Sequence, residues 1–167
     1  AGLMRETKRV WGIQFSLEDV PDLYETYAAV ELPRAQRLGF RSIRTILRWD
    51  FVEPENVAPG AFDWSLYDRR FAEYTDAGYD IVVTVVAYPS WATEWQCGGA
   101  LLPGMDAEWR SFLREAARRY RGPRYRVVAW EIGNEVDGKT KIVDADHERS
   151  PDWGGGQPTT PYGGCWG

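Results

Sequence analysis

The sequence predicts an α/β fold in which helices connect neighbouring parallel strands. Segments with the composition of strands alternate with segments of helical periodicity, which is typical of a parallel sheet with crossover helices. Two strand segments, 81–86 and 127–132, are nearly continuous apolar runs, as expected of buried strands. The 167 residues suffice for one sizeable core but fall well short of the roughly 250 residues of a closed eight-stranded α/β barrel.

The first strand is predicted at about residues 10–15 and the second at 42–48. Between them lies a helical region in which Pro33 suits a first-turn position, because a proline there gives up no helical hydrogen bond. Gly39 suits the end of this helix after Leu38, since glycine readily adopts the left-handed conformation that closes a helix.

A second helix is predicted after a loop that contains proline and glycine. Asp63 or Ser65 can cap its beginning, because a short polar side chain accepts the free N–H groups of the first turn. Its buried face is predicted to carry Tyr67, Phe71 and Tyr74.

The third helix has the clearest pattern, with Asp106 as its predicted cap and Gly122-Pro123 as its end. Apolar residues recur along it at i, i+3, i+4 and i+7 spacing: Trp109, Phe112, Leu113, Ala116, Ala117 and Tyr120. The fourth strand follows at 127–132, so that the predicted order is β-α-β-α-β-α-β.

The chain is predicted to divide into a domain at 1–138 and an irregular segment rich in glycine and proline at 139–167. Four parallel strands joined by crossovers of one hand would have all their helices on one face of the sheet. The inward face and two sheet edges would then be uncovered. We therefore expect a second half, supplied by a following segment, another polypeptide or a second copy.

Composition and charge argue against several classes of function. A net charge of −5 and a pI of about 5.0 disfavour nucleic acid as a partner, because binding to phosphate needs clustered Lys and Arg. One local basic cluster is expected to form a solvated outer face: Arg110, Arg114, Arg118, Arg119, Arg121, Arg124 and Arg126. No apolar run approaches the roughly 18 residues of a membrane span, and secreted and cytoplasmic locations are both open.

The sequence indicates neither a metal nor a cofactor. A single histidine, His147, is a poor basis for a metal-dependent enzyme, which needs several converging ligands. No strand is followed by the Gly-x-Gly-x-x-Gly turn of dinucleotide-binding proteins. The two cysteines, Cys97 and Cys165, lie in glycine-rich loops expected at the same end of the sheet, so a disulfide and two free thiols are both possible.

The fourth predicted strand leads directly into a polar pair, Asn134 and Glu135. In an α/β barrel the side chains at the carboxyl ends of the strands face the mouth where substrate binds. An amide and a carboxylic acid at this position are therefore candidates for catalysis and substrate binding.

Several short motifs occur in a fixed order along residues 10–138: Gly39-Phe40-Arg41-Ser42-Ile43-Arg44, Trp49 with Glu53-Pro54, Gly60-Ala61-Phe62-Asp63-Trp64 leading to Tyr67-Asp68, Ala77-Gly78-Tyr79-Asp80, Tyr88-Pro89-Ser90-Trp91-Ala92, and Trp130-Glu131-Ile132-Gly133-Asn134-Glu135. With these motifs the chain resembles the amino-terminal half of a retaining glycoside hydrolase of the large clan that includes β-galactosidases, β-xylosidases and endoglucanases. The resemblance implies a TIM-type (β/α)8 barrel, of which this chain supplies about the first four strands and three helices. It also implies hydrolysis of β-glycosidic bonds in oligo- or polysaccharides, without a cofactor or a metal.

The resemblance also implies roles for individual residues. Glu135 would be the general acid/base, which protonates the leaving oxygen and then activates water. Asn134 would bind the hydroxyl next to the anomeric carbon, and Arg44 matches an arginine that supports the carboxylate site. Tyr88, Trp91 and also Trp49 would line the sugar site, because the C–H faces of a pyranose pack on aromatic rings.

The chain departs from the family pattern in one respect. A retaining enzyme needs a second carboxylate about 5–5.5 Å from the first, and in this clan it comes from strand seven, which the chain does not contain. The nucleophile is therefore expected outside this chain. Four acids within the chain were considered as the nucleophile, and none has a spacing that directs it towards Glu135: Asp50, Glu53, Glu94 and Asp137.

Each candidate also has a purely structural alternative. Glu135 could cap a backbone amide, and Asn134 could shape the turn. Arg44 could neutralise an interior acid such as Glu131, whose alternation with Glu135 directs it to the same face. The aromatic residues could serve packing alone. For the whole protein, the alternative to an enzyme is a non-catalytic carbohydrate-binding or assembly subunit built on a truncated barrel.

Overall fold

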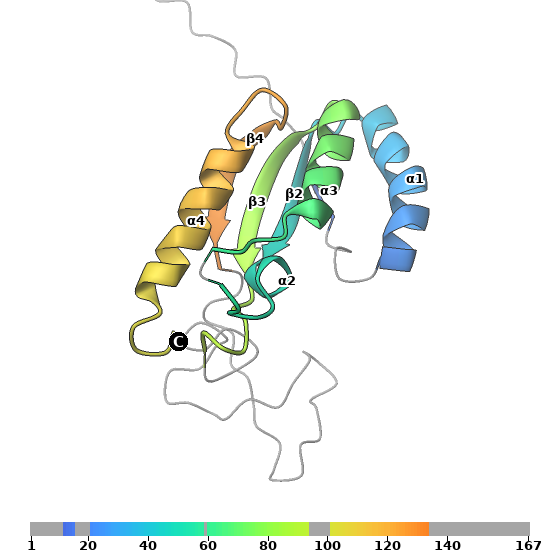
Figure 1. Cartoon of the computed structure of the whole chain (residues 1–167). Coiled ribbons are helices and arrows are strands. Elements are labelled where there is room, and N and C mark those ends of the chain that lie inside the picture. Colours follow the sequence, from blue (N-terminus) through green and yellow to red (C-terminus); the bar gives the residue numbers. More distant parts are fainter. Residues whose placement is uncertain (1–11, 16–20, 59, 94–100, 134–167) are drawn as a thin grey trace, which may run out of the picture.

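The structure is a computed structural model that describes residues 12–15, 21–58, 60–93 and 101–133. Within these ranges the chain forms one parallel sheet of four strands, in the order β1-β2-β3-β4 (Figure 1). The strands are β1 (Gly12–Gln14), β2 (Ser42–Arg48), β3 (Asp80–Val86) and β4 (Val127–Ile132). The predicted α/β class is confirmed, and the predicted bounds of the second and fourth strands agree with β2 and β4.

Helices connect the strands: α1 (Pro21–Arg37), α2 (Trp49–Val52), α3 (Ser65–Asp76) and α4 (Asp106–Tyr120). In Figure 1, α3 and α4 lie across the front of the sheet, and α1 lies beside α3. The side chain of Gln36 on α1 donates a hydrogen bond to the carbonyl of Ala77, directly after α3. Three of the helices were predicted, whereas α2 is an additional single turn that follows β2 immediately.

Two helices end in the same backbone motif before the next strand. Gly39 has a φ of +92°, its N–H donates to the carbonyl of Gln36, and the N–H of Phe40 donates to the carbonyl of Ala35. Gly78 has a φ of +83° and closes α3 with the equivalent pair of bonds. Because only glycine adopts this left-handed conformation without strain, the predicted helix end at Gly39 is confirmed with its cause.

The position of Pro33 was predicted wrongly. Pro33 lies inside α1, which begins at Pro21, and not in the first turn. A proline inside a helix lacks the N–H that would bond to the preceding turn. Leu32 and Ala35, on either side of it, are buried against the core. We attribute the continuation of the helix to this packing, because tertiary contacts override local preference.

The beginnings of the two later helices differ from the predictions. Asp63 accepts the backbone N–H of Ser65 at 2.9 Å, and hydrogen bonds from Ser65 lower the pKa of the Asp63 carboxyl. The cap position of α3 nevertheless belongs to Trp64, which makes no side-chain capping bond, so the prediction that Asp63 or Ser65 caps this helix was wrong. Asp106 likewise is the first residue of α4 and not its cap; the cap position belongs to Met105, which makes no side-chain capping bond. As a first-turn residue, Asp106 still interacts favourably with the positive end of the helix dipole.

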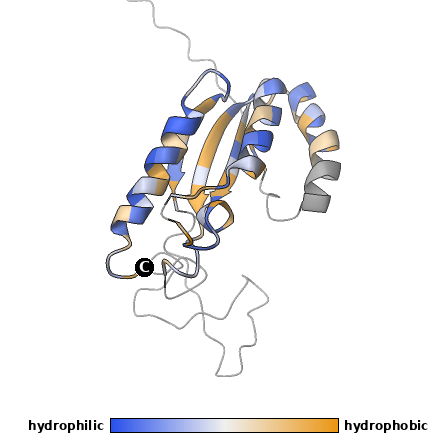
Figure 2. Ribbon diagram, viewed as in Figure 1, coloured by the Kyte–Doolittle hydropathy of each residue, from blue (hydrophilic) through white to orange (hydrophobic). Residues whose placement is uncertain are grey.

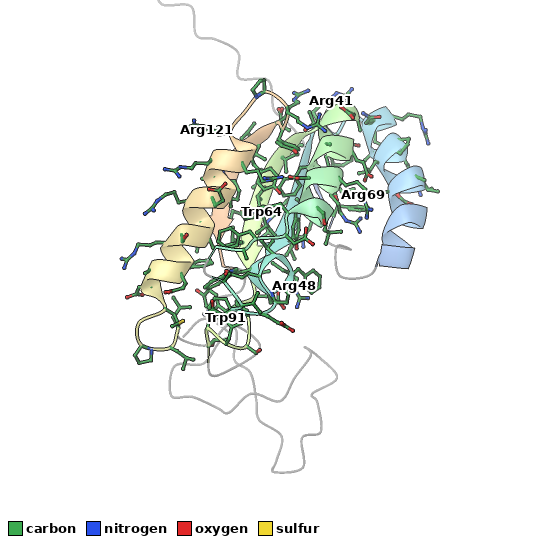
Figure 3. All side chains as sticks on the ribbon, viewed as in Figure 1. Arg41, Arg48, Trp64, Arg69, Trp91 and Arg121 are labelled. Carbon is green, nitrogen blue, oxygen red and sulfur yellow. The ribbon has the colours of Figure 1, made fainter. Side chains whose placement is uncertain are left out.

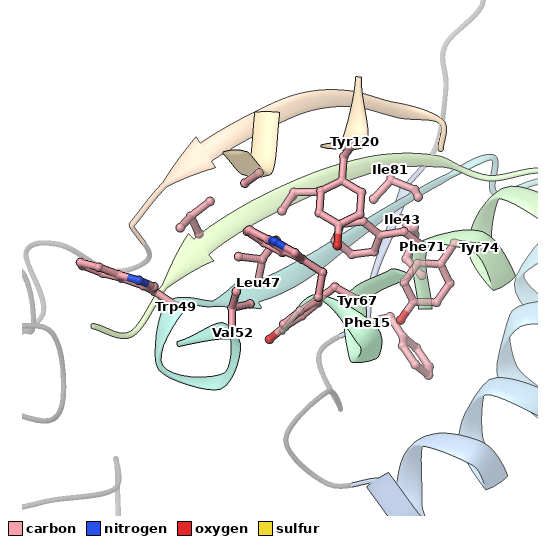
Figure 4. Close-up of a cluster of buried hydrophobic side chains, with 14 of the residues drawn as sticks. Phe15, Ile43, Leu47, Trp49, Val52, Tyr67, Phe71, Tyr74, Ile81 and Tyr120 are labelled. Atoms are coloured by element: carbon pink, nitrogen blue, oxygen red, sulfur yellow. The ribbon is translucent and has the colours of Figure 1, made fainter. Parts of the chain in front are cut away.

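The core lies between the sheet and the helices. Alternate residues of β2 and β3 point towards the helices and are fully buried: Ile43, Leu47, Ile81, Val83 and Val85. Large aromatic residues from the helices and nearby loops cover them: Trp64, Tyr67, Phe71, Tyr74, Phe112 and Tyr120 (Figure 4). Figure 2 shows the apolar sheet behind helices whose outer surfaces are largely hydrophilic. The core is therefore made of aromatic rings packed against a sheet whose buried residues are mostly β-branched.

The fourth strand was predicted as a buried run, and among the described residues this is wrong. In the described sheet β4 is an edge strand, and Val128 and Ile132 are 62% and 55% exposed. A register shift occurs between Val127, which pairs with Ile81, and Ala129, which pairs with Val82. The apolar composition of β4 is that of a strand with a neighbour on both sides, but within the described part of the chain β4 pairs only with β3.

None of the described helices is long and apolar enough to cross a membrane.

Candidate active site

The face of the sheet opposite the helices carries polar side chains in register. Because Ile43, Thr45 and Leu47 point towards the helices, the alternate residues of β2 point the other way. The strand pairing aligns them in rows: Gln14, Arg44, Val82 and Ala129 form one, and Ile46, Thr84 and Glu131 form the next. We call this side of the sheet the inner face.

One polar contact of the inner face joins β2 to β4. Nε of Arg44 donates to Oε2 of Glu131 at 2.6 Å, and the hydroxyl of Thr84 on β3 donates to the same oxygen at 2.7 Å. Nη1 of Arg44 donates to the side-chain carbonyl of Gln14 at 3.2 Å. One guanidinium and one carboxylate therefore connect all four strands.

The charge state of Glu131 follows from these contacts. The hydrogen bonds from Thr84 and from Arg44, together with the positive charge of Arg44, lower the pKa of the Glu131 carboxyl against the opposing effect of burial. Glu131 is therefore an anion at neutral pH and cannot serve as a proton donor. Arg44 was predicted either to support the carboxylate site or to neutralise an interior acid such as Glu131. The structure shows the contact with Glu131.

A second arginine–carboxylate pair lies at the carboxyl end of β2. Arg48, the last residue of the strand, donates from Nε and Nη2 to the two oxygens of Asp50 at 3.0 and 2.6 Å. Its guanidinium also lies 4.1 Å from the ring centre of Phe51. Arg48 was not among the predicted site residues, although its alternation with Arg44 and Ile46 indicates the same inward direction.

Trp49 does not line a sugar site. It is fully buried, its indole N–H donates to Oε2 of Glu53 at 2.9 Å, and its ring stacks on Phe112 at a centroid distance of 5.4 Å. The expectation for Trp49 is therefore corrected, because the docking of α4 against α2 turns this residue into the core. Glu53, 2% exposed, is occupied in holding the indole.

Tyr88 and Trp91 lie together in the segment that follows β3. Both are half-buried and contact Trp49 edge-on, with ring centroids 5.9 and 5.3 Å away. The indole N–H of Trp91, whose side chain is labelled in Figure 3, donates to the carbonyl of Glu53 at 3.1 Å. Burial raises the pKa of the Tyr88 hydroxyl, which is therefore protonated at neutral pH. The two rings thus sit at the carboxyl end of the sheet, in the loop expected to face a substrate.

The residue before Tyr88 has a backbone conformation that is rare for a residue with a side chain. Ala87 has a φ of +55°, and its carbonyl accepts the N–H of Asp50 at 3.3 Å. A left-handed alanine costs about 1–2 kcal/mol. The strain lies where the loop after β3 meets the turn after β2, which is a position typical of functional loops.

The described part of the chain ends at Gly133, directly before the predicted catalytic pair. The N–H of Gly133, which has a φ of +83°, donates to the carbonyl of Val85 at 2.9 Å and so continues the pairing of β4 with β3. Asn134 and Glu135 follow directly in the sequence but lie outside the described residues. The following also lie outside them: Glu94, Cys97, Asp137, His147, Cys165 and the segment 139–167. Among the described residues, no group of three or more His, Cys, Asp and Glu could hold a metal ion.

The fold is shared with several solved glycoside hydrolase structures. A β-galactosidase from the psychrophilic Marinomonas ef1 superposes with a TM-score of 0.55 at 17% identity over 76% of this chain. A family 39 glycoside hydrolase from the gut symbiont Bacteroides cellulosilyticus gives 0.53 at 20% identity over 76% of this chain. A GH5_18 protein from Bifidobacterium longum subsp. longum, in complex with Manβ1-4GlcNAc, gives 0.58 at 15% identity over 81% of this chain. No family model and no curated protein matches the chain.

The chain corresponds to only a part of each of these structures. It covers 22% of the β-galactosidase, 24% of the family 39 enzyme and 35% of the GH5_18 protein. At these identities the likeness establishes the fold of the described part: a parallel α/β sheet of the kind found in glycoside hydrolases.

Proposed function

We propose that this chain is the first half of the catalytic barrel of a retaining β-glycosidase. In this proposal Glu135 is the general acid/base and Asn134 binds the hydroxyl beside the anomeric carbon. The nucleophilic carboxylate is supplied from outside the chain, and the substrate is a β-linked oligo- or polysaccharide. No cofactor or metal takes part.

The position of β4 carries the proposal. β4 is the fourth of four parallel strands, its pairing runs to Gly133, and Asn134 and Glu135 follow without an intervening residue. Side chains at the carboxyl ends of parallel strands gather at one end of the sheet, where ligands bind in α/β folds. Tyr88 and Trp91 lie at that same end and offer aromatic surface for a sugar.

The proposed chemistry needs two carboxyl groups in opposite charge states. Glu135 must be protonated at first, so that it can give its proton to the leaving glycosidic oxygen; the second carboxylate attacks the anomeric carbon and forms a glycosyl-enzyme intermediate. Glu135 then takes a proton from water, which releases the sugar with its configuration retained. Arg44 supports the carboxylate site by favouring the anionic form of the attacking group.

We also propose that a second half-barrel completes the site. The exposed apolar residues of β4 and the half-buried inner face support this, because both have the composition of surfaces that a neighbouring strand covers. The second half can be a following segment of the same polypeptide, another chain or a second copy.

The test of the proposal is hydrolysis of aryl β-glycosides by the assembled protein, meaning this chain together with its second half. Glu135→Gln is expected to lower kcat/KM by about 10²- to 10⁴-fold, the usual contribution of general acid/base catalysis. With Glu135→Ala, added azide is expected to restore turnover of a substrate with a good leaving group, since azide attacks the glycosyl-enzyme intermediate without a general base.

Glu31→Gln is the matched control, because Glu31 is a solvent-accessible glutamate on α1 whose ion pair with Arg34, at 3.7 Å, is a weak surface contact. Its rate is expected to equal that of the unaltered protein. Sugar binding without turnover, unaffected by Glu135→Gln, would instead identify a non-catalytic carbohydrate-binding subunit.

A further inference from the structure

The Glu131 carboxylate of the inner face has no part in the proposed reaction. Oε2 of Glu131 accepts one hydrogen bond from Arg44 and one from Thr84, and these donors belong to two different strands. Arg44 in turn is the residue expected to support the carboxylate site. Glu131 is thus placed to act on the reaction through Arg44.

We propose that Glu131 is a positioning residue, which fixes the direction of the Arg44 guanidinium and partly neutralises its charge. The inference rests on the proposed function, since it concerns the same site. It assigns a role to the acid that precedes Glu135 by four residues in the sequence.

The geometry explains how one carboxylate can orient the whole guanidinium. Arginine has a long side chain with many rotamers, but its planar head becomes fixed once acceptors lie along two of its edges. Glu131 binds the Nε edge at 2.6 Å, and Gln14 binds Nη1 at 3.2 Å. The bond from Thr84 at 2.7 Å holds the carboxylate itself in place. Contacts from three other strands therefore set the direction of one side chain on β2.

The charges on this face make the electrostatic effect of Glu131 specific. Arg48 is paired with Asp50 at the carboxyl end of β2, and Asp80 is paired with Arg126 at the amino end of β3. Among the described residues the remaining charges of the inner face are Arg44 and Glu131, paired with each other. Removal of the Glu131 charge would make the field around the Arg44 cation more positive, and this would lower the pKa of neighbouring carboxyl groups.

The decisive variant is Glu131→Gln in the assembled protein, because glutamine keeps the shape of glutamate and loses its charge. We expect kcat/KM to fall about 10- to 100-fold, the usual effect of a small misplacement in an active site. We also expect both limbs of its pH profile to move to lower pH. Glu131→Asp, which retains the charge, is expected to restore the original pH profile with only part of the rate.

Asp80→Asn is the matched control. It breaks an arginine–carboxylate pair on the same sheet with the same N···O distance of 2.6 Å, but at the amino end of β3. The rate and the pH profile of Asp80→Asn are expected to stay unchanged. An unshifted pH profile in Glu131→Gln, or an equal loss of rate in both variants, would show that Glu131 serves stability alone.

Two further measurements keep the inference testable if Glu131→Gln does not fold or if the protein hydrolyses no glycoside. Thr84→Val, which has a similar shape, is expected to lower kcat/KM about three- to tenfold without a pH shift, because the Glu131 charge remains. By NMR, the Nε–H of Arg44 is expected to exchange slowly in the unaltered protein and faster in Thr84→Val. Absence of turnover in the unaltered protein would refute the proposed function, whereas equal exchange rates in the two proteins would refute the positioning role.

Discussion

At the scale of single residues, charged side chains and one indole on the inner face and in the loops beside it are each hydrogen-bonded to a defined partner. Arg44 is held by Glu131, Arg48 by Asp50, and the indole of Trp49 by Glu53. A buried or half-buried polar group is stable only when its hydrogen bonds are made, so each pairing also fixes a direction. The candidate site is therefore built on side chains whose positions are set before any substrate arrives.

The strained backbone of Ala87 gives a prediction at this scale. Glycine adopts a φ of +55° without strain, so Ala87→Gly is expected to raise the free energy of unfolding by about 0.5–1 kcal/mol. This gain is the strain that is relieved, minus the conformational entropy that glycine adds to the unfolded chain. Ala117→Gly, at an exposed position inside α4, is the control and should lower it by about 1 kcal/mol. Urea denaturation of the assembled protein measures both. A loss of stability in Ala87→Gly would show that the left-handed conformation is not strained.

At the scale of elements, the helices are attached to one another by a polar network as well as by the aromatic core. Asp68 on α3 accepts a hydrogen bond from Nε of Arg119 on α4 at 2.7 Å. The hydroxyls of Tyr120 and Tyr125 donate to the same carboxylate at 3.2 and 3.3 Å. The apolar faces decide that α3 and α4 pack together, and this network fixes how they are aligned.

The network gives a prediction about pH. Burial by itself would raise the pKa of Asp68, but hydrogen bonds and the positive charge of Arg119, with the two tyrosine hydroxyls, lower it below the ordinary 3.8. A carboxyl group whose pKa is lower in the folded protein than in the unfolded chain stabilises the fold at pH values above its unfolded-state pKa. This stabilisation is lost as the pH falls through the folded-state pKa. Because Arg119 is 38% exposed, we expect Asp68→Asn to cost only about 1 kcal/mol at pH 7.

The measurement is the free energy of unfolding of the assembled protein at pH 7 and near pH 3. Asp68→Asn should differ from the unaltered protein at pH 7 and approach it at the lower pH. Glu73→Gln serves as the control, because its ion pair with Arg69 on the surface of α3 is long, at 4.0 Å. A deficit in Asp68→Asn that persists unchanged at low pH would mean that packing, and not charge, is responsible.

At the scale of the whole molecule, the sheet is covered on one face by helices and aromatic residues. The other face is half-buried, and the edge strand β4 exposes Val128 and Ile132. Open apolar strand edges pair readily with other chains, and soluble proteins normally cover or charge them. A completing half-barrel would cover the edge and the inner face together.

The open edge predicts how the 167-residue chain behaves when it is produced alone. We expect it to self-associate and to unfold without a sharp transition. Ile132→Lys should make the isolated chain more soluble, since a charge on an edge strand opposes pairing. The same substitution should weaken its association with the second half. Light scattering with size exclusion, combined with calorimetry, checks these outcomes; a monodisperse, cooperatively unfolding monomer of the isolated chain would contradict the proposed second half.

Local patterns in the sequence determined the order of the elements, the bounds of β2 and β4, and the helix end at Gly39. These features depend on periodicity and on the few backbone angles open to each residue, which are properties of neighbours along the chain. The alternation of inward residues also made Glu131 a candidate partner for Arg44. The assignment of Glu135 and Asn134 was made from the sequence and stays a prediction.

Only the tertiary structure decided which of several similar residues is buried and which pairs form. Trp49 and Trp91 are alike in the sequence, yet the docking of α4 buries Trp49 and leaves Trp91 half-exposed. The pairing of Arg48 with Asp50, and the burial of α1 around Pro33, likewise depend on contacts with distant segments. Side-chain type sets what a residue can do, whereas its neighbours in space, brought together by burial of the aromatic core, select which of these possibilities is realised.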